Sequence, residues 1–386
     1  MFNRTLSKEI LELSKGYPIV TILGPRQSGK TTLAKHLFPD KPYINLEAPD
    51  VRLKAEMDPR GFLGQFKNGA VLDEIQRAPW LLSYIQVMVD EIEGNGFFIL
   101  TGSHQLELNQ AISQSLAGRT ALCTLLPLSL EELISAKISL SIDEYILSGG
   151  YPRLHKDHLN PTILYRSYFQ TYVEKDVRQL ITIKDLSSFE KFIMLLAGRV
   201  GQLINHESLA NDVGISSHTV KHWISILEAS FIVTKLQPYY ENFGKRQIKS
   251  AKIYFLDTGF LCFLLGIETT AQLSRDPLRG QIFENLAFLE LYKARLHRSL
   301  EPRLYFFRDV QGHEIDLIFH QGSELIPIEI KAAQTFHPEF VKQINYFHNL
   351  VPLRTSQGFL IYTGTKGVLG HIKLLNILDS RSAVGL

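Results

Sequence analysis

The first third of the chain contains four short apolar runs, each bounded by turn-forming or polar residues. They lie at 18–23, 70–72, 97–100 and 121–126, and this pattern predicts buried β-strands. The first run is followed at 32–38 by apolar residues at helical spacing. The pattern therefore predicts an α/β domain at this end of the chain.

The second half of the chain carries further strand-like runs. Two lie at 231–236 and 252–255, and three more lie at 304–309, 314–319 and 326–331. At roughly 100–200 residues per domain, a chain of 386 residues has room for two to four domains. We therefore expect an α/β protein with several domains.

The overall composition excludes some classes of protein. Lys and Arg total 41 and Asp and Glu total 39, so a uniformly basic coat is excluded while a local basic patch is not. Two cysteines without a CxxC motif argue against a disulfide scaffold or a thiolate zinc site. No apolar run reaches the ~18 residues of a membrane span, and the amphipathic N-terminus is unlike a secretory signal. We expect a cytoplasmic protein with no membrane partner.

The turn after the first predicted strand reads GPRQSGKT and matches G-x-x-x-x-G-K-[ST] at every fixed position. Glycines at both ends let backbone amides face phosphate oxygens, and a following helix adds its N-terminal partial charge. Lys30 supplies a full charge to the β- and γ-phosphates, and Thr31 offers a hydroxyl to Mg²⁺. The expected nucleotide contacts are Gly24, Pro25, Arg26, Gln27, Ser28, Gly29, Lys30, Thr31 and Thr32.

Two other predicted strands end in polar residues suited to hydrolysis. Asp73 can hold the magnesium shell, and Glu74 can orient or deprotonate the attacking water. An ordinary strand followed by an acidic helix cap is the alternative. At the end of the next strand, Thr101 or Ser103 can sense the γ-phosphate or position water, and we favour Ser103.

Arg119 lies two residues before the fourth predicted strand, in the sequence Ala-Gly-Arg-Thr. An arginine at this point of an oligomeric ATPase faces the nucleotide of the neighbouring subunit and stabilises transition-state charge. A solvated surface arginine is the competing interpretation.

The order of these elements resembles an AAA+ ATPase. The segments GPRQSGKTTL, VLDEIQ, LTGS and LAGR are similar to those of a prokaryotic family, AAA_14/DUF4143, in which an ATPase module precedes a domain of unknown function. The resemblance implies a parallel-sheet ATPase core over 1–128 and a helical lid over 129–185. It also implies an enzyme that hydrolyses ATP with Mg²⁺. If Arg119 acts in trans, the active form is a homo-oligomer such as a hexameric ring.

Gly149-Gly150-Tyr151-Pro152-Arg153 lies in the predicted lid. A G-x-P at the start of a lid helix is similar to the element that some regulatory and origin-binding relatives place against adenine. Pro152 would then contact the base and Arg153 the phosphates; a simple helix break is the alternative. The aromatic spacing that follows predicts a buried helix face rather than a base-stacking surface, and it comprises Tyr165, Tyr168, Phe169, Tyr172 and Val173.

Residues 186–256 show the pattern of a winged helix-turn-helix. Two amphipathic segments flank Gly214, Ser216 caps the second, and a basic hairpin follows. The second helix has one lysine and no arginine or glutamine, so a protein-contact module is the alternative to a DNA-binding one. The candidate DNA-binding residues are Ser217, His218, Lys221 and His222 on the helix and Lys245, Arg246 and Lys249 on the wing.

Residues 257–378 carry an acidic constellation. Glu284 lies on a predicted helix, Asp316 on a strand, and Glu329 and Lys331 on one face of the next strand. The pattern resembles the PD-(D/E)xK nuclease fold, an α/β restriction-endonuclease-like domain. It implies that the three carboxylates hold Mg²⁺ while Lys331 stabilises the attacked phosphate. A domain that has kept this fold only for binding or docking is the alternative.

We expect an AAA+ ATPase that couples ATP hydrolysis to the binding or remodelling of DNA, including branched DNA, through the winged helix and the C-terminal domain. One alternative is a nucleotide-switched regulatory or scaffold protein that binds a protein partner. A further alternative is an ATP-stimulated, magnesium-dependent nuclease.

Overall fold

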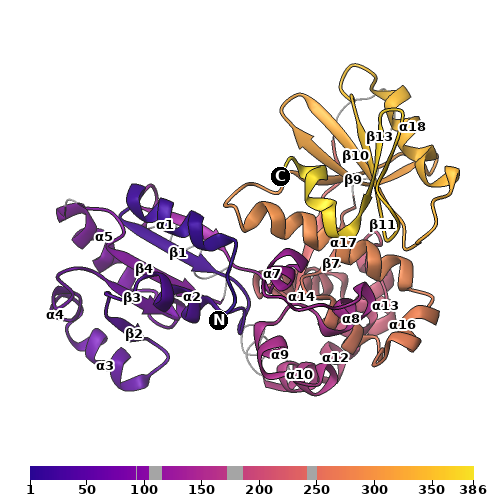
Figure 1. Ribbon diagram of the computed structural model, residues 1–386. Coiled ribbons are helices and arrows are strands. Elements are labelled where there is room, and N and C mark those ends of the chain that lie inside the picture. Colours follow the sequence, from indigo (N-terminus) through magenta and orange to yellow (C-terminus); the bar gives the residue numbers. More distant parts are fainter. Residues whose placement is uncertain (93, 104–114, 172–185, 241–249) are drawn as a thin grey trace. The chain divides into compact units, whose positions relative to one another are not determined.

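The computed structural model describes residues 1–92, 94–103, 115–171, 186–240 and 250–386, and it divides into two compact units (Figure 1). Unit 1 comprises Met1–Leu128, Ala229–Phe231 and Leu296–Leu300. Unit 2 comprises Ser129–Glu228, Ile232–Arg295 and Glu301–Leu386. In the part of the chain that the structure describes, none of the helices has the length and apolar character needed to cross a membrane.

Unit 1 is built on a five-stranded parallel sheet in the order β2-β3-β4-β1-β5. This sheet confirms the predicted parallel α/β domain. Strand β4 lies between β1 and β3, so its carboxyl end separates the ends of the other two. The strands are β1 (Ile19–Leu23), β2 (Tyr43–Asn45), β3 (Ala70–Asp73), β4 (Phe98–Gly102) and β5 (Thr120–Thr124).

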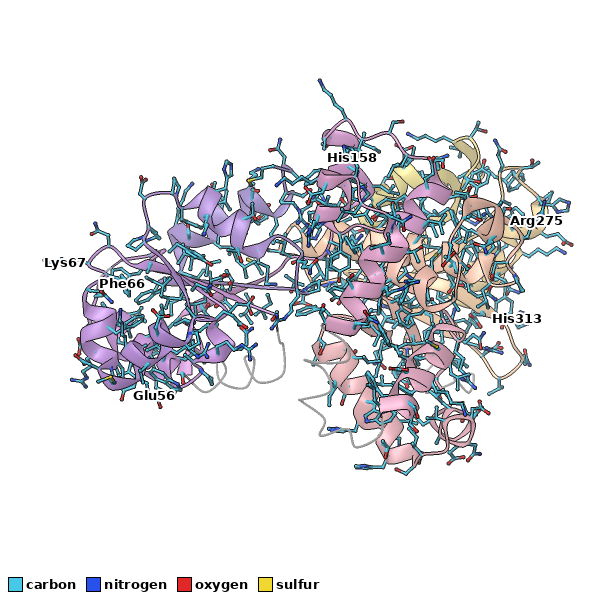
Figure 2. All side chains as sticks on the ribbon, turned by 90° about the horizontal axis from the view of Figure 1, so that it is seen from below. Glu56, Phe66, Lys67, His158, Arg275 and His313 are labelled. Carbon is cyan, nitrogen blue, oxygen red and sulfur yellow. The ribbon has the colours of Figure 1, made fainter. Side chains whose placement is uncertain are left out.

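Helices cover this sheet and shield its apolar residues. Ile10 of α1 and Leu33 of α2 are buried with Val20 and Ile22 of β1 in one core cluster. At the surface of unit 1, Glu56 and Lys67 are exposed (Figure 2). The helices are α1 (Leu6–Gly16), α2 (Lys30–Leu37), α3 (Pro49–Met57), α4 (Pro59–Gly64), the 3₁₀ turn η1 (Ile75–Arg77) and α5 (Leu81–Glu91).

The first part of unit 2 is helical. It contains α7 (Leu130–Ser135), α8 (Ile142–Ser148), α9 (Pro152–Asp157), α10 (Pro161–Tyr168), α12 (Leu186–Ala197), α13 (His206–Val213) and α14 (Ser217–Ala229). The antiparallel pair β6 (Val233–Leu236) and β7 (Lys252–Phe255) follows, then α15 (Thr258–Leu264) and α16 (Thr270–Arg275). The structure therefore places three helices and a two-stranded antiparallel sheet within 186–256, and the winged-helix assignment of this segment stays a prediction.

The second part of unit 2 is a mixed six-stranded sheet in the order β12-β13-β11-β10-β9-β8. Pro327 falls where β10 pairs only with β9, because the pairing with β11 begins at Ile328. The elements are α17 (Arg279–Leu296), β8 (Leu304–Arg308), β9 (Glu314–Gln321), β10 (Glu324–Ile330), η3 (Pro338–Val341), α18 (Lys342–Leu350), β11 (Gly358–Tyr362), β12 (Gly367–Leu369), β13 (Ile372–Asn376) and η4 (Ile377–Val384).

The Gly149-Gly150 turn between α8 and α9 is packed inside unit 2. The amide of Gly150 donates to Asp257 Oδ2 at 2.8 Å, and the Tyr165 hydroxyl lies 2.7 Å from Asp257 Oδ1. A Cβ atom at Gly149 would lie 2.3 Å from both Asp257 Oδ1 and the Tyr165 hydroxyl oxygen. These contacts give the two glycines a packing role that does not depend on whether Pro152 and Arg153 contact a nucleotide. Tyr168 and Phe169 are buried as predicted, while Tyr172 and Val173 lie outside the described residues.

Candidate active site

The predicted phosphate loop connects β1 to the N-terminus of α2, which begins at Lys30. Gly24 lies so close to β5 that a Cβ atom there would be 2.1 Å from the carbonyl oxygen of Leu125. Gly29 has φ +97°, in the left-handed region that glycine adopts without steric cost. Both glycines are thus required by the geometry of the loop.

An arginine that the sequence analysis missed supports the loop from behind. The guanidinium of Arg4 is buried and donates to the carbonyl oxygens of Ser28, at 2.8 Å, and Leu126. It therefore ties the loop to the chain beyond β5. No sequence signal distinguishes Arg4, because its partners lie 24 and 122 positions away.

Lys30 points back into the loop. Its Nζ donates to the carbonyl oxygens of Gly24 at 3.0 Å and Pro25 at 2.8 Å. Burial lowers the pKa of Lys30 to about 8, although the negative charges of Glu74 and Asp73 oppose that shift. A bound anion would stabilise the Lys30 ammonium more than the two carbonyl dipoles do, because it carries a full negative charge.

Asp73, at the end of β3, accepts hydrogen bonds from three hydroxyl groups. The Thr31 hydroxyl lies 2.9 and 3.0 Å from its two carboxylate oxygens, and the Tyr43 hydroxyl donates at 2.7 Å. Thr101 donates to it from the end of β4. The structure thus brings together Thr31 and Asp73, the two residues predicted to hold magnesium. Tyr43 was missed because its position follows only from the pairing of β2 with β3.

Glu74 is held by two polar side chains. Its carboxylate Oε2 accepts from the Ser103 hydroxyl at 3.2 Å and from the amide of Gln76. The Gln76 amide also donates to Ser103 Oγ at 3.0 Å, which closes a three-residue network. Glu74 itself has φ 58°, an unfavourable backbone conformation for a residue with a side chain. The network and the strained backbone fix the direction of this carboxylate.

These residues fit a nucleoside triphosphate with a divalent cation. Ser28 Oγ is fully buried and has no hydrogen-bond partner among the residues that the structure describes. That orphaned hydroxyl, the glycine cradle and the inward-pointing Lys30 suit a bound phosphate. A hydroxyl and a carboxylate in contact are oxygen ligands of the kind Mg²⁺ prefers, and Thr31 and Asp73 would hold it.

Arg119 forms an ion pair with Asp90 on the surface of unit 1. Its Nε and Nη2 donate to the two carboxylate oxygens at 2.5 and 2.8 Å, and both side chains are partly exposed. The surface location fits both interpretations of this arginine. A role in a neighbouring active site requires the pair with Asp90 to break.

Pro152 and Arg153 begin α9 in unit 2. The Arg153 side chain is exposed and lies 3.5 Å from Asp157, one turn further along the helix. Contact of these two residues with the nucleotide stays a prediction.

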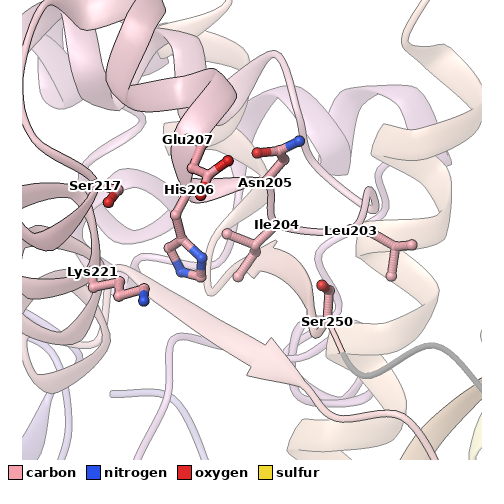
Figure 3. A pocket seen from close by; sticks show the side chains of 8 residues that line it. All are labelled: Leu203, Ile204, Asn205, His206, Glu207, Ser217, Lys221 and Ser250. Atoms are coloured by element: carbon pink, nitrogen blue, oxygen red, sulfur yellow. The ribbon is translucent and has the colours of Figure 1, made fainter.

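The four helical candidates for DNA binding lie at the start of α14. His218, Lys221 and His222 are exposed, and Ser217 is half-buried. Ser217 and Lys221 line a pocket of about 450 Å³ together with His206 and Ser250 (Figure 3). The three wing residues Lys245, Arg246 and Lys249 lie outside the described residues.

The nuclease-like constellation of unit 2 is gathered in one place. Lys331 Nζ lies 2.8 Å from Glu329 and 3.4 Å from Asp316, and Glu284 is near enough to Asp316 for the two charges to repel. Burial, reinforced by the charge of Asp316, raises the pKa of Glu329 to about 8. A lysine absent from the prediction, Lys252, also lies here and contacts Glu284 at 3.1 Å.

Three family profiles match successive segments of this chain. A family profile described as "AAA domain" (AAA_14) matches residues 16–134, and two described as domains of unknown function match residues 139–271 (DUF8612) and 279–377 (DUF4143). An uncharacterized protein of Mycobacterium tuberculosis is 31% identical over 351 residues, covering 90% of this chain and 77% of the relative. One from Haemophilus influenzae is 25% identical, covering 67% of this chain and 64% of the relative.

Two solved structures share a weaker likeness. The Walker-type ATPase PABY2304 of Pyrococcus abyssi is 14% identical with a TM-score of 0.47, covering 68% of this chain and 96% of that one. AMPPCP-bound DnaA of Aquifex aeolicus is also 14% identical, with a TM-score of 0.28 over 58% of this chain and 86% of that one.

Gln76 is expected to be a positioning residue for Glu74. Loss of a hydrogen bond to a charged group costs about 1.5–3 kcal/mol, so Gln76→Ala should lower kcat for ATP hydrolysis roughly 10- to 100-fold. The affinity for a fluorescent ATP analogue should stay near that of the wild type, because the Gln76 amide contacts Glu74 and Ser103, which lie outside the phosphate loop. Gln65→Ala, an exposed glutamine of the same unit, is the matched control. An unchanged kcat, or a loss of affinity in place of kcat, would contradict this role.

Proposed function

The chain belongs to the family of P-loop ATPases in which an AAA domain precedes a DUF4143 domain, and on this premise we propose that it couples ATP hydrolysis in unit 1 to the binding or remodelling of DNA by unit 2. The observation that carries the proposal is the convergence of Lys30, Thr31, Asp73 and Glu74 at the carboxyl ends of β1 and β3. In this proposal Thr31 and Asp73 supply oxygen ligands for Mg²⁺, and Glu74 supplies the base for the attacking water.

In the proposed reaction, each residue of unit 1 has a separate task. Lys30 neutralises charge on the β- and γ-phosphates, and Thr31 and Asp73 would hold a Mg²⁺ ion, which would supply positive charge to the phosphate oxygens. Glu74 orients the attacking water and accepts its proton. Ser103 and Gln76 keep the Glu74 carboxylate in place, so little reorganisation is needed when the water attacks.

Arg119 completes the site from a neighbouring subunit in this proposal, and the active form is a homo-oligomer such as a hexameric ring. Its side chain is partly exposed and so accessible to a second copy, and exchange of Asp90 for a phosphate would strengthen its charge pairing.

Mixing two inactive variants tests this arrangement. Lys30→Ala subunits supply an intact Arg119, and Arg119→Ala subunits supply an intact phosphate loop. A one-to-one mixture should therefore regain roughly a quarter or more of wild-type ATP hydrolysis, whereas each variant alone stays inactive. Wild-type protein mixed with Lys30→Ala is the control for simple dilution. Full activity of Arg119→Ala alone would leave the arginine a surface residue.

The DNA-binding part of the proposal is supported by the start of α14. Lys221 and two histidines are exposed there, and the adjacent pocket carries the Ser217 hydroxyl and the His206 ring, all groups that can contact phosphate. A helix with one lysine can make few hydrogen bonds to DNA bases. We therefore propose that it contacts the phosphate backbone of the DNA, independently of the base sequence. The same scarcity of charge favours the second candidate function, a nucleotide-switched scaffold that binds a protein.

Fluorescence anisotropy with labelled duplex, single-stranded and branched DNA separates the two functions. Lys221→Ala should weaken binding and reduce the slope of log K against log salt by about one, since each phosphate contact contributes about 0.9. Lys191→Ala, an exposed lysine on α12, should leave both quantities unchanged. Absence of binding to every substrate at low salt, with and without ATP, would favour the scaffold.

A further inference from the structure

Four carboxylates of unit 2 meet between α17 and the strands β9 and β10. Glu314 and Asp316 are two residues apart on β9 and so share a face of the sheet. The register that pairs Ile328 with Leu317 brings Glu329 of β10 beside Asp316, whose Oδ2 accepts the amide of Ile330 at 2.8 Å. Glu284 joins them from α17. This is the cluster in which the nuclease resemblance requires a divalent metal ion.

A lysine from a different part of unit 2 lies in this cluster. Lys252 begins β7, and its side chain is only 3% exposed. Its Nζ lies 3.1 Å from Glu284 Oε1 and 2.6 Å from Glu314 Oε1, so one ammonium bridges α17 and β9. The Tyr254 hydroxyl, on the same strand, donates to the same oxygen of Glu284.

The other carboxylates also have cations beside them, although Glu329 Oε1 is buried and has no hydrogen-bond partner among the residues that the structure describes. Lys331 contacts Glu329 and Asp316, and Arg308 Nη1 lies 3.3 Å from Glu314 Oε2. Each of the four carboxylates therefore has at least one cationic partner within 3.4 Å. Among residues 1–92, 94–103, 115–171, 186–240 and 250–386, no group of three or more His, Cys, Asp or Glu side chains is arranged to hold a metal ion.

These residues do not fit the metal ion that the nuclease resemblance implies. A divalent cation ligated by Glu284 would share that carboxylate with the buried Lys252 ammonium, and like charges at this range repel strongly away from water. Moving Lys252 aside would instead leave its charge buried and unpaired, which is also costly.

We propose that the Lys252 ammonium is the resident cation of this carboxylate cluster, so that it takes the place of the metal ion and ties β7 to α17 and β9. The C-terminal domain is then a binding or docking element with a nuclease-like fold. Its carboxylates regain affinity for a divalent cation only when the ammonium is removed. The inference concerns unit 2 alone and stands independently of the ATPase assignment.

Titration of the full chain with Mn²⁺ in the absence of nucleotide, followed by electron paramagnetic resonance, tests this inference. Lys252→Met removes the charge and keeps most of the side-chain volume. It should bind one Mn²⁺ roughly tenfold or more tightly than the wild type binds any ion at this cluster, because the competing positive charge is gone. The added Asp316→Asn should abolish the new site.

Two further variants separate charge from general disruption. Lys252→Arg keeps the positive charge and should gain no site. Lys293→Met removes another buried lysine, the partner of Glu290 at 3.5 Å, and should gain none either. Thermal melts followed by circular dichroism show whether each variant folds.

Two results would overturn the inference. The first is a folded Lys252→Met protein that gains no Mn²⁺ site. The second is a wild-type protein with a Mn²⁺ site, or Mn²⁺-dependent DNA cleavage, that Asp316→Asn removes. The second comparison needs no substitution at Lys252 and so holds even if Lys252→Met fails to fold. Neither result bears on ATP hydrolysis, since no nucleotide is present.

Discussion

The contact between the Thr31 hydroxyl and the Asp73 carboxylate is the interaction on which the nucleotide site depends. It joins the first turn of α2 to the end of β3, although β4 lies between β1 and β3 in the sheet. The carboxyl ends of the parallel strands meet at one edge, and the phosphate loop begins there. The place of β4 in the sheet thus brings the Thr101 hydroxyl to the Asp73 carboxylate and the Ser103 hydroxyl to the Glu74 carboxylate.

The parts of this site that sequence can predict are those fixed by local chemistry. The spacing of Gly24, Gly29 and Lys30 is dictated by phosphate geometry within a single turn, so the motif reveals the loop and its flanking elements. Thr101 and Ser103 were both recognised as candidates, but their assignment to Asp73 or Glu74 depends on the pairing of strands. Gln76 is only two residues from Glu74, yet its role follows from the left-handed backbone at Glu74, which periodicity does not reveal.

Long-range partners account for what sequence analysis missed in unit 2. The acidic constellation around Asp316 was predicted from strand alternation, and the structure gathers it. The pattern does not show that Lys252, from the antiparallel hairpin, lies among the same carboxylates, because that contact joins segments 32 and 62 positions apart. In our proposal, this buried lysine takes the place that the nuclease resemblance gives to a metal ion.

We propose that Glu74 activates water in a site assembled by Lys30, Thr31 and Asp73. The most direct measurement is phosphate release from ATP by the wild type and by Glu74→Gln, with the affinity for ATP measured on the same samples. We expect turnover to fall by roughly 100-fold or more, as when a general base is lost, while ATP binds with wild-type affinity. Unchanged turnover in Glu74→Gln would show that Glu74 is not the base.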